Sequence, residues 1–141
     1  MWHYFHRMSE IPISARAQAQ DEVAFVEKLR SGKPILFKPR GRSMEPHLRD
    51  GTVVMIDPVT RPPHVGEVVL AVFAGVTTLH RVVKLRANQV WLWGDAMRHG
   101  EGPIPIDAVV GIARTAPLPF KIRFRLACRR ILFTLARLFG G

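Results

Sequence analysis

Residues 41–51 of this chain read GRSMEPHLRDG. A glycine stands two positions before Ser43 and a proline three positions after it, so we expect a sharp turn here and neither a helix nor a strand. A serine in such a turn usually has a structural role. Ser43 therefore gains functional meaning only from the segments around it.

The segments around this turn carry the patterns of short β-strands. Runs rich in β-branched residues and bounded by turn residues predict extended segments at 34–37, 52–56, 67–73, 77–85, 89–93 and 104–113. Ala74-Gly75 is a hairpin signal between two of them. We expect loops at 59–66 and 97–103, and a short amphipathic helix at 17–30 that Ser31-Gly32 ends. The pattern indicates a mainly β fold.

Five short motifs in a fixed order resemble the signal-peptidase/LexA superfamily of serine peptidases. They are the serine box at 41–51, VGEVVL at 65–70, LHRVV at 79–83, GDA at 94–96 and VVG at 109–111. One motif alone would be weak, whereas five in order over residues 41–113 are specific. The resemblance implies a coiled antiparallel, barrel-like β-sheet, to which the residue patterns add an N-terminal helix and a C-terminal amphipathic helix.

The chain of 141 residues is long enough for one domain. We expect an N-terminal arm at 1–16, a peptidase domain at 17–117 and a basic amphipathic helix at 118–141. The N-terminus lacks the apolar core of a signal peptide, and no window is apolar enough for a transmembrane helix. We therefore expect a cytoplasmic body that its C-terminal helix can hold on the inner face of the cytoplasmic membrane.

The resemblance implies that Ser43 is a nucleophile and His80 its general base. Bacterial signal peptidases and LexA-type proteins have lysine before arginine at this position, whereas the endoplasmic-reticulum and archaeal type has histidine, as His80-Arg81 does here. A serine hydroxyl needs a neighbouring base to become a useful nucleophile, and a neutral imidazole can take its proton and pass it to the leaving amine.

The third member of a triad stays open between three acids. Glu101 lies in the loop where the His-type signal peptidases have an aspartate, while Asp95 and Asp107 are the other candidates; we favour a structural role for Asp95 in its turn. A Ser-His dyad is the alternative. For the oxyanion and the substrate cleft we expect the Ser43 amide, a close turn at Gly41 and, by resemblance, Met44, which is otherwise a core methionine.

The C-terminal segment differs from the rest in charge. The net charge is +10, and no acidic residue follows Asp107. On a helix, one side of the segment carries the apolar residues Phe124, Ala127, Cys128, Ile131, Leu135, Leu138 and Phe139. This side could lie in a membrane interface or pack on the β body with the arginines in solvent, and we favour the membrane. Cys128, the single cysteine, is expected to be a packing residue.

These observations favour a serine endopeptidase that removes a leader or signal segment from a polypeptide precursor. A LexA-type self-cleaving regulator is one alternative, although the residues before Gly41 hold too few helices for a DNA-binding motif. A non-enzymatic module that binds lipid or nucleic acid is another. No cofactor or metal is expected, because the histidines lack zinc-site spacing. We do not expect nucleic acid as a partner, and the oligomeric state is left open.

Overall fold

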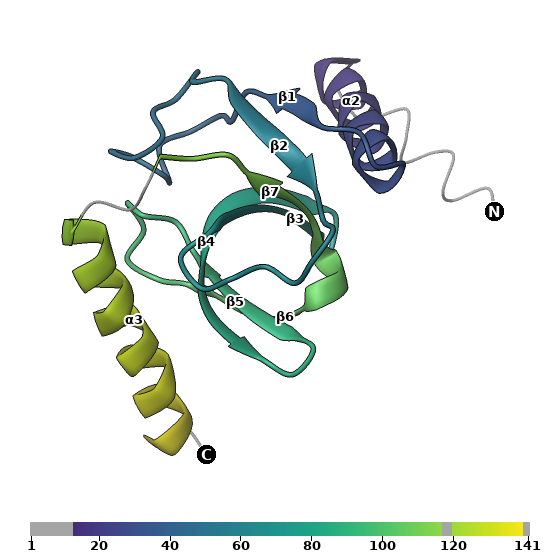
Figure 1. The fold of residues 1–141 in the computed structure, drawn as a ribbon. Helices are drawn as coiled ribbons and strands as arrows, with labels where there is room; N and C mark the ends of the chain where they lie inside the picture. Colours follow the sequence, from purple (N-terminus) through teal and green to yellow (C-terminus); the bar gives the residue numbers. More distant parts are fainter. Residues whose placement is uncertain (1–12, 117–119, 140–141) are drawn as a thin grey trace.

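The computed structural model describes the backbone of residues 13–116 and 120–139 (Figure 1). Most of the expected N-terminal arm, residues 1–12, lies outside the described residues, as do 117–119 and 140–141. The side chains of residues 13–20, 120, 122 and 137 are also outside the description.

The elements follow the order helix, strands, helix. They are α2 (Ile13–Arg30), β1 (Ile35–Phe37), β2 (Val54–Pro58), β3 (Val68–Phe73), β4 (Val76–Arg86), β5 (Gln89–Trp93), β6 (Glu101–Pro105), the 3-10 helix η1 (Ile106–Ala108), β7 (Val109–Ala113) and α3 (Phe120–Phe139).

The strands form one antiparallel sheet of seven strands in the order β1-β2-β7-β3-β4-β5-β6. The sheet curls strongly, with α2 beside the β1 end and α3 along the opposite side of the molecule (Figure 1). The expected mainly β fold with a helix at each end is therefore confirmed. The hairpin at Ala74-Gly75 is present as well: both residues have positive φ, at 51° and 76°, and Phe73 pairs with Val76.

Both faces of the curled sheet are buried, which explains the unbroken apolar run in β3. Val68 and Leu70 belong to one core cluster, with residues such as Leu29 of α2, whereas the alternate residues Val69 and Ala71 belong to a second cluster. Side chains alternate between the two faces of a strand, so a strand buried on both sides needs apolar residues at every position.

Several expected boundaries are wrong, among them the strand expected at 52–56, which is β2 at Val54–Pro58. The helix begins at Ile13, four residues before the expected start. The loop expected at 97–103 ends early, because β6 starts at Glu101, opposite Leu92. The segment 104–113 is not one strand, since η1 separates the end of β6 from β7. Pairing with β5 places Gly102 and Pro103 in an edge strand, the part of a sheet in which proline is tolerated.

Helix α3 packs on the body with the side opposite to its apolar side. The partly buried Phe133 stacks edge to face on Trp93 with ring centroids 5.3 Å apart, and Arg129 is only 8% exposed. The apolar side points away, with Phe124 65% and Leu138 72% exposed. The interpretation in which the apolar side covers the β body is therefore wrong. Cys128 is exposed, so its expected packing role is wrong too.

Candidate active site

Ser43 lies in the turn between β1 and β2, and the residues after it anchor that turn in the core. Met44 is 4% exposed and belongs to the first core cluster together with Leu48, whose amide donates to the carbonyl oxygen of Met44 at 2.9 Å. The carbonyl oxygen of Ser43 accepts a hydrogen bond from the amide of Ala96 at 2.8 Å. The serine backbone is thus held from two sides.

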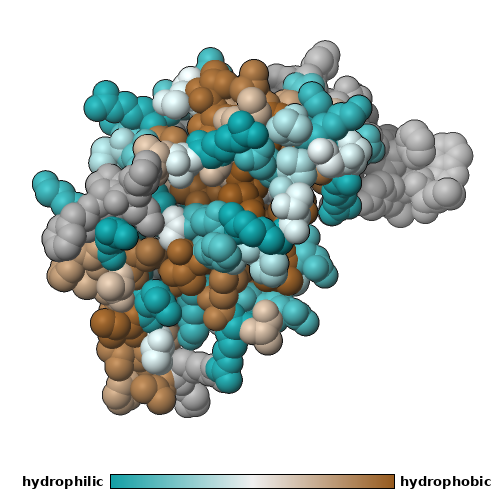
Figure 2. Space-filling model, viewed as in Figure 1, coloured by the Kyte–Doolittle hydropathy of each residue, from teal (hydrophilic) through white to brown (hydrophobic). Residues whose placement is uncertain are grey.

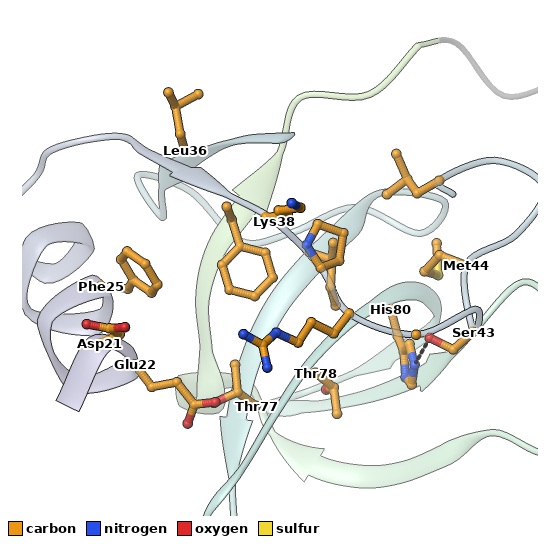
Figure 3. Close-up of a pocket in the computed structure, with 16 residues that line it drawn as sticks. Asp21, Glu22, Phe25, Leu36, Lys38, Ser43, Met44, Thr77, Thr78 and His80 are labelled. Carbon is orange, nitrogen blue, oxygen red and sulfur yellow. Dashed lines mark hydrogen bonds between the residues drawn. The ribbon is translucent and has the colours of Figure 1, made fainter. Parts of the chain in front are cut away.

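His80 lies on β4 opposite Val69 of β3. Its Nε2 is 3.1 Å from the Oγ of Ser43, although the two residues are 37 positions apart in the chain (Figure 3). Its other ring nitrogen, Nδ1, is hydrogen-bonded to Oε1 of Glu101 in β6. The side chain of His80 is 11% exposed and that of Glu101 is 44% exposed. One ring nitrogen of His80 therefore faces a hydroxyl group and the other a carboxylate.

The three candidate acids lie in three different surroundings. Glu101 contacts His80, as described above. Asp95 is 2% exposed and pairs with Arg81 through two hydrogen bonds, Nε to Oδ1 at 2.9 Å and Nη2 to Oδ2 at 2.7 Å. Asp107 is exposed in η1. Since Ser43 and Glu101 occupy the imidazole nitrogens, only Glu101 is placed to orient His80.

The Arg81–Asp95 pair is part of the framework under the site. Arg81 follows His80 in β4, is 1% exposed, and also donates from Nη1 to the carbonyl oxygen of Gly66 at 2.7 Å. Burial and the positive charge of Arg81 hold the pKa of the nearby His47 below its usual value. A buried ion pair whose donors and acceptors are hydrogen-bonded fixes the positions of the segments it joins more than it adds to the free energy of unfolding.

Gly94 lies against both Ser43 and His80, which no local sequence pattern indicates. A Cβ atom at this position would lie 2.7 Å from the carbonyl oxygen of Ser43 and 3.1 Å from Nε2 of His80. Only glycine lets the segment after β5 approach the pair this closely. The GDA motif contained the signal, but its reason becomes visible only when Ser43 and His80 are in place.

Two arginines of α3 bind the same segment from the other side. Arg129 donates to the carbonyl oxygens of Gly94, Asp95 and Met97 at 3.2, 3.2 and 2.9 Å, and Arg125 donates to that of Asp95 at 3.0 Å. Burial lowers the pKa of Arg129 from its usual value. The residue pattern predicts a membrane interface or solvent around these arginines, and it misses their role because no local pattern marks a helical arginine whose acceptors are backbone carbonyls.

A cleft of about 510 Å³ extends from the Ser43–His80 pair (Figure 3). Figure 3 shows Ser43 and His80 pointing toward each other at one end and Asp21 and Glu22 of α2 at the other. Met44 lines the cleft and also belongs to the first core cluster. The Gly41 amide donates to Oδ1 of Asp50 at 3.0 Å, and Gly41 has a φ of 91°, which fits the close turn expected there.

Backbone edges border this cleft. The part of β4 before Arg81 pairs with β3, while its ladder with β5 starts at the Arg81–Trp93 pair. On the other side, β1 is an edge strand of the sheet. Thr77, Thr78 and the residues after β1 all line the cleft. An extended peptide could therefore find main-chain partners on either side.

Among residues 13–116 and 120–139, no group of three His, Cys, Asp or Glu side chains is placed to hold a metal ion. None of the described helices is long and apolar enough to cross a membrane.

Residues 9–114, most of the chain, match the family model described as Peptidase S24-like, which lies in the LexA/signal-peptidase superfamily that the motifs indicated. Neither the comparison with curated proteins nor the one with solved structures finds a match.

Proposed function

We propose that this chain, which belongs to the Peptidase S24-like family, is an endopeptidase that cuts an extended segment of another polypeptide with Ser43 as nucleophile and His80 as general base. The observation that carries the proposal is the distance of 3.1 Å between Nε2 of His80 and Oγ of Ser43 at one end of a cleft. This is hydrogen-bond reach for proton transfer from the nucleophile.

Each group has one task in this reaction. As the Ser43 oxygen attacks the scissile carbonyl, its proton passes to Nε2 of His80, which then delivers it to the leaving amine. A water molecule, deprotonated by the same nitrogen, releases the acyl group from the serine. Glu101 accepts a hydrogen bond from Nδ1, which keeps the Nε2 lone pair directed at Ser43 and stabilises the imidazolium ion that forms.

The tetrahedral intermediate needs donors for its oxyanion. The backbone N–H of Ser43 is the first donor in this proposal, since the backbone on both sides of it is held by the core and by Ala96. The Gly41 amide is already used by Asp50, so Gly41 contributes the turn and not a donor.

The substrate class follows from the shape of the cleft. A volume of about 510 Å³ accepts several side chains of a peptide, and the free edges of β1 and early β4 offer ladder partners to an extended main chain. We therefore propose a flexible leader or linker of a precursor as the segment that is cut.

The decisive experiment compares four variants of the full chain on a library of unstructured peptides, with products read by mass spectrometry. Ser43→Ala and His80→Ala should lose cleavage by about 10³-fold or more. The matched controls Ser31→Ala and His99→Ala change exposed residues and should cleave as the original chain does. Equal cleavage by Ser43→Ala would refute the assignment.

The same samples distinguish a processing peptidase from the main alternative, a self-cleaving regulator. Intact-mass measurement over time detects cleavage of the chain by itself. Self-cleavage that depends on Ser43, with every added peptide left intact, would replace the processing peptidase by a self-cleaving regulator.

A further inference from the structure

Helix α3 presents an apolar face to solvent, because its other face is used by the body. Arg125, Arg129 and Phe133 point inward, and their contacts with the segment after β5 and with Trp93 set the rotation of the helix. A Cβ atom at Gly100 would lie 2.5 Å from the Cζ atom of Phe133, so the helix approaches the body closely. Packing of these inward side chains therefore determines which side of α3 faces the solvent.

The outward face is a continuous apolar stripe. Its large exposed members are Phe124 at 65%, Ile131 at 59%, Leu135 at 43%, Leu138 at 72% and Phe139 at 85% exposure. At about 100° per residue these positions fall on one side of the helix. Figure 2 shows hydrophobic surface gathered over this helix at the lower left of the molecule. Scattered apolar residues on a surface are ordinary, whereas a contiguous stripe of this kind marks an interaction site.

The charge around the stripe identifies the partner. Arg123 and Arg130 are exposed on its flank, and Lys121 is exposed near the start of the helix. No acidic residue occurs in α3 or anywhere after Asp107. A second copy of this helix would bring like charges together, while an anionic lipid surface offers acyl chains to the stripe and phosphates to the arginines.

The body adds positive charge beside the C-terminal half of α3. A groove of about 430 Å³ is lined by Phe133 and Ala136 of the helix and by Lys84, Arg86 and Trp91 of the β4–β5 hairpin. The ammonium group of Lys84 lies over the Trp91 ring at 4.8 Å. Amphipathic aromatic and cationic side chains of this kind favour the headgroup region of a membrane.

We propose that α3 docks this protein on an anionic membrane surface, lying in the plane of the interface with its apolar stripe below the headgroups and Arg123 and Arg130 at the level of the phosphates. The inward face of the same helix holds the segment that contacts Ser43, so docking fixes the orientation of the cleft relative to the membrane. This inference does not depend on the peptidase proposal.

The test measures binding of the full chain to vesicles of neutral phosphatidylcholine, with and without anionic phosphatidylglycerol, by sedimentation. The original chain should bind the anionic vesicles and bind the neutral ones at least about tenfold more weakly, and added salt should weaken binding. Arg123→Gln with Arg130→Gln should weaken it by roughly 25-fold, at about fivefold for each arginine. Ile131→Gln with Leu138→Gln should weaken it by roughly tenfold or more.

Matched control variants replace the same kinds of side chain elsewhere on the exposed surface. Lys33→Gln with Arg49→Gln removes two charges, and Val53→Gln with Val76→Gln removes two apolar side chains. Both control pairs should bind as the original chain does. All changed residues are exposed, so the variants should unfold at the same denaturant concentration as the original chain.

A second measurement reports the position of the helix directly. Cys128 is the single cysteine and is exposed on the outward side, so an environment-sensitive fluorophore can be attached there. Its emission should shift to the blue with anionic vesicles. Three results would overturn the proposal: no binding and no shift, binding that survives the Ile131/Leu138 change, or a dimer in sedimentation velocity that this change dissociates without any vesicle binding.

Discussion

The hydrogen bonds of Arg129 make a quantitative prediction about how α3 supports the candidate active site. Arg129→Met keeps the apolar stem and removes three bonds to the carbonyl oxygens of residues 94, 95 and 97. Bonds from a charged donor contribute about 1.5–3 kcal/mol each, and the stacking of the guanidinium on Trp93, 4.5 Å from the ring centre, adds about 1 kcal/mol.

Adding the contributions of the three hydrogen bonds and the stacking overstates the loss of stability. The bonds share one guanidinium, and burial of that charge opposes folding, as its lowered pKa indicates. A net loss of about 3 kcal/mol is therefore expected. Because the 94–97 segment donates to the carbonyl oxygen of Ser43, part of this loss should appear as displacement of the serine and as a decrease of about 10- to 100-fold in kcat/KM.

The assay combines urea unfolding with peptide cleavage, and Arg130→Met is the control. Arg130 is exposed on the same helix, so its replacement removes an equal charge without removing bonds to the segment. The free energy of unfolding should fall for Arg129→Met alone, and the cleavage rate should fall with it. If both variants unfold at the same urea concentration and cleave equally fast, the helix does not support the site and the reasoning is refuted.

Three further changes test the site and its framework. Glu101→Gln should lower kcat by about 10- to 100-fold and leave KM nearly unchanged, because the carboxylate is half exposed and stabilises the imidazolium less than a buried one would; an unchanged kcat would favour a dyad. Asp95→Ala should cost about 3–5 kcal/mol of stability in thermal unfolding by leaving Arg81 buried and unpaired, whereas a loss below 1 kcal/mol would contradict a structural role. Hydrogen bonds from Arg61 hold the pKa of Glu67 below its usual value, so the unfolded state binds more protons in acid, and stability falls as the pH drops from about 5 through the lowered pKa. Glu67→Gln should flatten that decline in urea titrations at successive pH values, and an unchanged slope would show that this ion pair does not contribute.

The parts of the fold that depend only on residues close together in the sequence could be predicted from the sequence. The hairpin at Ala74-Gly75 needs two residues that accept positive φ, and the flanking strands show their apolar pattern without help from other segments. The boundaries of β6 could not be predicted this way. The sequence Glu101-Gly102-Pro103 is typical of a loop, and it becomes a strand only because β5 offers a ladder beside it.

The candidate site divides in the same manner. By itself the sequence determined that Ser43 sits in a turn, that His80 sits in a strand, and that both belong to motifs in the order of one peptidase superfamily. It also determined that the C-terminal helix has one apolar and one basic side, since this depends only on residue spacing.

Only the tertiary structure decided which acid meets the imidazole and which side of the helix meets the body. Glu101 reaches His80 because β6 pairs with β5 and β5 with β4, whereas Asp95 is taken by the buried Arg81. The side of α3 that carries Arg129 turns inward because three carbonyl oxygens of one segment converge on its guanidinium group. Such choices depend on contacts between residues far apart in the chain, and no local pattern of residues records where backbone acceptors will meet in space.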